Sequence, residues 1–141
     1  MQGLHETVAA HDLSDSVSVL GFVSGAEKQR VLREAWAFAL PSHQENFGVA
    51  VLEAIAAGLP VVLSAEVQLR AFVEAKDLGV IVDRTDPGSI AEGLRAVLDD
   101  VTRRERVAEQ GPAAVQDAFS VARMGEQVRS LYEQALAAAR S

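Results

Sequence analysis

Short apolar runs recur along this chain, and most are followed by a segment with the residue spacing of an amphipathic helix. Three of the runs are continuously apolar, which is typical of strands buried on both faces of a parallel sheet, whereas the first alternates polar and apolar residues. The pattern predicts strands at Val17–Leu20, Ala37–Leu40, Val61–Leu63 and Gly79–Val82. About four strands are therefore expected.

Helices are expected after each of these strands. The apolar stripe of the first helix includes Leu32 and Trp36, so we expect Trp36 in the core. Gly58 marks a helix end, while Asp86 as N-cap and Pro87 at the first helical position mark a helix start. The pattern predicts these helices at Ala26–Trp36, Phe47–Ala57, Glu66–Lys76 and from Asp86 to about Leu98.

The C-terminal part of the chain has helical spacing and no strand pattern. We expect helices at Thr102–Gln110, at Pro112–Phe119 after a break at Gly111, and at Ala122–Ala139 with Ser120 as its N-cap.

Strands that alternate with helices indicate an α/β domain with a doubly wound parallel sheet, covered by helices on both faces and followed by a helical tail. Residues 1–141 are interpreted as a single domain. In such sheets ligands bind outside the carboxyl ends of the strands. The loops Gly21–Gly25, Pro41–Gly48 and Ser64–Val67 are expected at that edge, where they form one candidate crevice.

The composition narrows the function classes. The net charge is -7 and the basic residues are scattered, which argues against a nucleic-acid surface. The chain has no cysteine, which excludes disulfides, zinc–thiolate sites and thiol catalysis. The N-terminus has no signal-peptide pattern, and no apolar run is long enough to span a membrane. We therefore expect a cytoplasmic location, with peripheral attachment of the full enzyme to a membrane left open.

Two carboxylates stand out around the loop at Pro41–Gly48. Glu45 lies in the loop and Glu53 within the following helix, so their Cα atoms are expected about 10 Å apart. That distance is too long for a shared proton or metal, but it suits two hydroxyl-bearing ends of one ligand. The free N–H groups between them, with Gly48 permitting close approach, suit a phosphate. The alternative, ordinary helix electrostatics and a solvated Glu53, remains open, although the apolar neighbours of Glu53 predict a partly buried carboxylate.

Residues 41–62 read P-S-H-Q-E-N-F-G-V-A-V-L-E-A-I-A-A-G-L-P-V-V. This stretch resembles the core signature of the retaining glycosyltransferases of the GT-B fold, glycosyltransferase family 4 or group 1, including its E-x7-E pair. The segments Val19–Ser24, Leu78–Val82 and Phe119–Tyr132 also resemble that family, so the resemblance covers roughly residues 4–137. It implies a Rossmann-like domain that binds a nucleotide-sugar donor for transfer of a hexosyl group to an acceptor.

The same resemblance implies roles for individual residues. Glu45, assigned to the catalytic site, would bind hydroxyls of the donor sugar, and Glu53 would bind the ribose hydroxyls. The backbone of four residues would contact the sugar and diphosphate, and a turn of two residues would pass the base: Asn46, Phe47, Gly48 and Val49 for the backbone, Phe22 and Val23 for the turn. No metal and no cofactor besides the nucleotide sugar is implied.

The sequence also departs from the family. The donor half of the family normally begins with a further strand, helix and strand that carry an Arg and a Lys for the diphosphate. We expect this chain to start after those elements and to lack the N-terminal acceptor-binding domain. Glu66–Leu69 stands where the family has a Gly-Gly loop. Lys28, Arg70 and Arg84 are interpreted as solvated side chains, and His43 as a residue without a role in donor binding.

From these departures we expect a partial donor domain that does not transfer sugar by itself, with a sheet edge that favours self-association. A non-catalytic α/β binding module and one half of a split glycosyltransferase remain alternatives.

Overall fold

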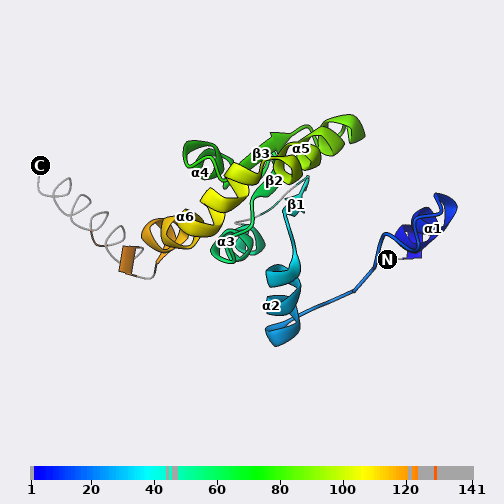
Figure 1. Cartoon of the computed structure of the whole chain (residues 1–141), viewed down its shortest axis with the longest axis horizontal. Helices are drawn as coiled ribbons and strands as arrows, with labels where there is room; N and C mark the ends of the chain where they lie inside the picture. The colour runs from blue at the N-terminus through cyan, green and yellow to red at the C-terminus, as the bar shows by residue number, and fades with distance from the viewer. Residues whose placement is uncertain (1, 44, 46–47, 121, 124–128, 130–141) are drawn as a thin grey trace, which may run out of the picture. The chain divides into compact units, whose positions relative to one another are not determined.

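The computed structural model describes residues 2–43, 45, 48–120, 122–123 and 129 (Figure 1). The chain divides into two compact units, Met1–Arg33 and Glu34–Ser141, and each is described by itself. The first unit holds helix α1 (Gln2–Ala10) and all of helix α2 (Gly25–Glu34) except its last residue.

A parallel sheet of three strands forms the centre of the second unit (Figure 1). The strands β1 (Phe38–Leu40), β2 (Val61–Ser64) and β3 (Gly79–Val82) lie side by side in that order. Leu40 pairs with Leu63, and Leu63 pairs with Ile81, so the carboxyl ends of the three strands meet at one edge. This is the edge at which parallel sheets place their ligands.

Four helices accompany the sheet. Helix α3 (Val49–Ala56) joins β1 to β2, and helix α4 (Arg70–Ala75) joins β2 to β3. Helices α5 (Pro87–Asp99) and α6 (Val101–Phe119) follow β3. The helical interiors agree with the predicted segments, although α4 begins four residues later than expected.

The core lies on both faces of β2, whose residues are all buried. On one face Val62 and Val82 pack with Val97 of α5. Val61 and Leu63 point to the opposite face, because side chains alternate along a strand, and both are fully buried. Helices α3 and α4 both contact β2 and cover this second face. The expected α/β fold with helices on both faces is confirmed.

Asp86 and Gly58, which were predicted to mark a helix start and a helix end, do so in the structure. Asp86 caps α5, where its Oδ1 accepts a hydrogen bond from Gly88 N at 2.8 Å. Gly58 adopts a left-handed conformation with φ of 85° just beyond α3. Both predicted helix boundaries are confirmed.

The predicted break at Gly111 is wrong, because α6 runs through it and through Pro112 without interruption. A Cβ atom added to Gly111 would lie 2.8 Å from the carbonyl oxygen of Ile55. The missing side chain therefore lets α6 approach the backbone of α3. Pro112 removes one backbone donor from the helix but does not end it.

The predicted strand Val17–Leu20 is also wrong, since these residues belong to no strand. The described part of the chain therefore has three strands, where about four were expected. A strand needs a hydrogen-bonded neighbour, and the alternating pattern says nothing about whether such a neighbour is present. The central residue of β1, Ala39, is exposed, which corrects the expectation that β1 is buried on both faces.

Trp36 does not lie in the core. Its side chain is 64% exposed, and the guanidinium carbon of Arg104 lies 4.5 Å from the ring centroid. The exposed ring is thus stabilised by a cation–π contact. The predicted helix Ala26–Trp36 ends at Glu34, so Trp36 lies beyond α2 and is not part of its apolar stripe.

The end of the predicted tail, Ala122–Ala139, lies mostly outside the described residues. Ser120 Oγ accepts a hydrogen bond from Arg123 N at 3.2 Å, which fits the predicted N-cap. Within the described residues, no helix is both long and apolar enough to cross a membrane.

Candidate functional site

The candidate site is built on the loop of residues 41–48, which follows β1 at the carboxyl edge of the sheet and leads into α3. Asn46 and Phe47, both predicted to contact the donor, lie outside the described residues. Glu45, Gly48 and Val49 are described, and Val49 is 58% exposed at the first turn of α3. The geometry of the site rests on these residues and on the helix behind them.

Gly48 is the N-cap of α3 and adopts a left-handed conformation with φ of 75°. Its carbonyl oxygen accepts hydrogen bonds from Val51 N at 2.9 Å and from Leu52 N at 3.3 Å. No side chain caps this end of the helix. Gly48 itself is buried, but Val49 and Ala50 in the first turn of α3 are exposed, and there the helix dipole favours an anion.

Glu45 lies beside this helix end. A Cβ atom added to Gly48 would be 3.7 Å from Glu45 Cγ, so the Glu45 side chain packs directly against the cap residue. The Glu45 side chain is half-buried. A carboxylate near a helix N-terminus is electrostatically favourable, and it offers acceptor oxygens for hydroxyl groups of a ligand.

Glu53 lies in the middle of α3 between two buried residues, Leu52 and Ala54. Its side chain is half-buried, which confirms the expectation of a partly buried carboxylate. The structure thus places Glu45 in the loop before α3 and Glu53 within that helix.

Ser64 is a further residue of this site that the sequence analysis missed. It is fully buried at the carboxyl end of β2, and its Oγ donates a hydrogen bond of 2.6 Å to the carbonyl oxygen of Ser42. This bond joins the last residue of β2 to the candidate loop. The sequence feature that could have identified Ser64 is its hydroxyl group at the end of an otherwise apolar strand.

Phe22 and Val23 belong to the first compact unit. Phe22 is 93% exposed and Val23 is half-buried. The structure describes the two units separately, so the predicted contact of these residues with the base of the donor stays a prediction.

Two arginines of the candidate edge form ion pairs. Arg70 Nε lies 3.2 Å from Glu74 Oε2 within α4, and Arg84 Nε lies 3.2 Å from Glu66 Oε1. Just beyond β3, hydrogen bonds from the Thr85 hydroxyl and amide hold the pKa of the Asp83 carboxyl below its ordinary value. Among the described residues, no group of His, Asp or Glu side chains is arranged to hold a metal ion.

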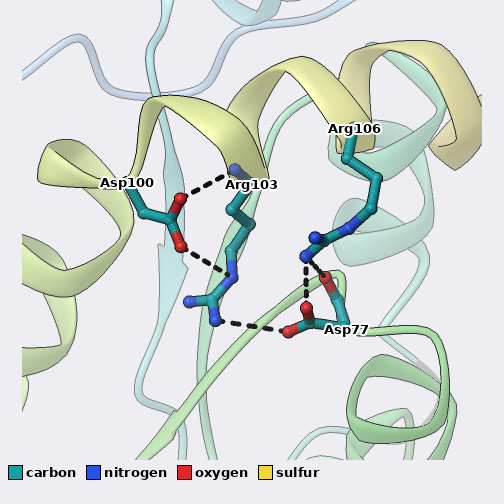
Figure 2. A network of polar contacts seen from close by, with 4 residues as sticks. All are labelled: Asp77, Asp100, Arg103 and Arg106. Atoms are coloured by element: carbon teal, nitrogen blue, oxygen red, sulfur yellow. Dashed lines mark hydrogen bonds and ion pairs between the residues drawn. The ribbon is translucent and has the colours of Figure 1, made fainter.

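A larger polar network lies at the opposite edge, just before β3 (Figure 2). Asp77 forms ion pairs with Arg106 and with Arg103, whose Nη2 lies 3.2 Å from Asp77 Oδ1. Asp100 accepts a hydrogen bond from Arg103 N at 2.8 Å and its other oxygen faces Arg103 Nε (Figure 2). This network joins the α4–β3 turn to α6, so its role is structural.

Comparison with known proteins shows the family to which this chain belongs. Residues 2–114 match the family model described as glycosyl transferases group 1. The chain is 34% identical over 134 residues to a D-inositol 3-phosphate glycosyltransferase of Salinispora tropica, covering 95% of this chain and 28% of that protein. It is 32% identical over 120 residues to an uncharacterized glycosyltransferase of Methanocaldococcus jannaschii, covering 85% and 31% respectively.

A solved structure shows the same fold. Sucrose-phosphate synthase from Thermosynechococcus elongatus matches 97% of this chain with a TM-score of 0.79 and 28% identity, over 34% of its own chain. The present chain therefore spans about a third of the length of the proteins that it matches.

Proposed function

The chain belongs to the group 1 glycosyl transferases, and from this premise we propose that it binds the nucleotide-sugar donor of a retaining glycosyltransferase. The observation that carries the proposal is the uncapped start of α3. There, a left-handed glycine at the carboxyl edge of a parallel sheet precedes an exposed first helical turn that no side chain caps. Glu45 packs against the same residue. A diphosphate with a sugar on one side and a ribose on the other fits this arrangement in charge and hydrogen-bonding capacity.

In this proposal the first turn of α3 receives the diphosphate, through the backbone of residues 46–49. Glu45 accepts hydrogen bonds from hydroxyls of the sugar, and Glu53 accepts them from the ribose. Phe22 and Val23 line the base. We propose no metal, as the family resemblance implies, and the helix N-terminus adds favourable charge for the phosphates.

The proposed reaction replaces one bond to the anomeric carbon by another. An acceptor hydroxyl forms the new C–O bond on the face that the nucleoside diphosphate leaves. The departing phosphate oxygen takes the proton of the hydroxyl, so atoms and charge balance. Glu45 orients the sugar during this exchange. The acceptor is proposed to bind to another domain, so the 141-residue chain alone is expected to bind donor without transferring sugar.

The sheet offers a surface for such a neighbouring segment. β1 is an edge strand of the described sheet and its central residue, Ala39, is exposed. Backbone groups on an unpaired edge favour the addition of a strand. We propose that a further part of the enzyme, or a second copy of this chain, pairs there.

Titration calorimetry with uridine, guanosine and adenosine diphosphates, alone and as their glucose conjugates, tests the donor assignment. Glu53→Gln keeps the size of the side chain but removes its charge, so we expect about tenfold weaker binding of both ligand types. Glu45→Gln is expected to weaken only the sugar conjugate. Glu92→Gln, an exposed change on α5, serves as the control.

The results of the binding and activity measurements distinguish the candidate functions. Failure of the wild-type chain to bind any of the six ligands would favour a binding module for other molecules and contradict the proposal. Sugar transfer by the isolated chain would contradict the need for another domain. Activity that appears only on mixing with a second polypeptide would identify half of a split enzyme.

A further inference from the structure

The segment between β2 and α4 contacts the candidate loop at two points. Ser64, at the end of β2, donates its 2.6 Å hydrogen bond to the carbonyl oxygen of Ser42 near the start of the loop. Leu69, at the start of α4, lies over the other end, since its Cδ1 would be 3.1 Å from a Cβ atom on Gly48. Ser42 and Gly48, near the two ends of the loop, therefore both contact residues of one neighbouring segment.

The Ser64 contact is polar, with a fully buried donor and a half-buried acceptor residue. The Ser64 side chain has no exposed surface, so loss of the hydrogen bond to Ser42 would leave its hydroxyl unpaired away from water. An O–H···O bond of this length is at the short end of the normal range and constrains the direction of the carbonyl group.

The Leu69 contact is apolar. Leu69 is 4% exposed and packs over Gly48, which must keep its left-handed conformation to start α3. Glu45 lies between the two fixed points in sequence and packs on Gly48 as well. The Glu45 side chain and the Leu69 side chain therefore contact the same residue at the start of α3.

We propose that Ser64 is a positioning residue of the donor site, which acts through Ser42 on the loop that carries Glu45. Its hydroxyl does not contact the ligand. It fixes the loop before the donor arrives, so that binding does not have to order the loop. The inference rests on the proposed function for its ligand, but the fixing of the loop is measurable without one.

Two substitutions separate the hydrogen bond from packing. Ser64→Ala removes the hydroxyl, and Ser64→Cys replaces it by a somewhat larger group that is a much weaker donor. Amide hydrogen exchange of peptides that cover residues 41–48 is expected to become about fivefold faster in both variants, as the loss of one such hydrogen bond implies. Ser89→Ala is the matched control, because Ser89 Oγ accepts a bond of 3.0 Å from Asp83 N at the end of the neighbouring strand β3. It should leave exchange in residues 41–48 unchanged.

A purely packing role for Ser64 predicts that Ser64→Cys exchanges like the wild type while only Ser64→Ala differs. That result, or unchanged exchange in both variants, would overturn the proposal. Equal acceleration in Ser89→Ala would do so too, because it would indicate general loosening of the sheet edge.

The second readout is affinity for the nucleotide sugar that binds the wild type most tightly. Both Ser64 variants are expected to bind it about fivefold more weakly, with a smaller change for the free nucleoside diphosphate, because the sugar is the part that Glu45 contacts. Faster exchange without any loss of affinity would refute the positioning role and leave the donor assignment intact. Absence of wild-type binding would instead refute the donor assignment, and the exchange data would still decide whether Ser64 fixes the loop.

Discussion

The side chain of Leu69 closes over the backbone of Gly48, with Leu69 Cδ1 only 3.1 Å from the place where a Cβ atom on Gly48 would be. The two residues belong to neighbouring loops at the carboxyl edge of the sheet. Gly48 also has φ of 75°, a conformation that side chains disfavour. Space and backbone conformation thus both demand glycine at the start of α3.

Gly48→Ala is therefore expected to lower the free energy of unfolding by about 1–3 kcal/mol, from backbone strain and the contact with Leu69. Urea unfolding followed by circular dichroism measures the change. Gly3→Ala is the matched control, because Gly3 lies in α1 with nothing within 4 Å of its added Cβ atom. Equal stability of Gly48→Ala and wild type would contradict the left-handed cap.

The space around Gly111 also excludes a side chain, at the place where α6 packs on α3. A Cβ atom there would lie 2.8 Å from Ile55 O and 3.2 Å from Ile55 Cγ2. Gly111→Ala gains helix propensity but must separate two packed helices, and we expect a net loss of about 1–3 kcal/mol in the free energy of unfolding. Gln110→Ala, at an exposed neighbouring position, should stay within about 0.5 kcal/mol of the wild type. A stabilised Gly111→Ala would contradict the close approach of α6 to the backbone of Ile55.

The fold was largely predictable because its strands are local apolar runs and its helices carry local signals. Gly58 and Asp86 act on backbone groups within a few residues, so the sequence around them predicts their conformations. The pairing of Val17–Leu20 and the environment of Trp36 depend on distant residues. Apolar character alone does not specify which neighbour covers a side chain, and both predictions were wrong for that reason.

The candidate site likewise contains residues that the sequence predicts and one residue that it does not. Glu45, Gly48 and Glu53 lie within one short stretch of sequence, so their spacing on a loop and helix is visible without a structure. Ser64 contacts a residue 22 positions away along the chain. Its role depends on the register between β1 and β2, which no pattern within either strand specifies.

Trp36 is the sole tryptophan and reports its own environment. At 64% exposure, its fluorescence should resemble that of indole in water and should be quenched readily by acrylamide. Trp36→Ala is expected to cost about 1 kcal/mol or less in the free energy of unfolding, against about 3–5 kcal/mol for a buried tryptophan. Arg104→Gln should increase quenching, because Arg104 covers one face of the ring. Blue-shifted, protected emission would place the ring in a core after all.

The Asp77–Arg106 pair is expected to stabilise the attachment of α6 more than an ordinary surface pair does. Asp77 has φ of 50°, which asparagine tolerates, so Asp77→Asn removes charge without adding backbone strain. The Asp77 side chain is 54% exposed, which limits the gain. A double-mutant cycle with Arg106→Gln should give a coupling of about 0.5–1 kcal/mol, weakened by added salt. The equivalent cycle for Arg70 and Glu74, an exposed pair within α4, should give about 0.3–0.5 kcal/mol. Equal couplings in the two cycles would mean that the network of Figure 2 adds nothing beyond a solvated ion pair.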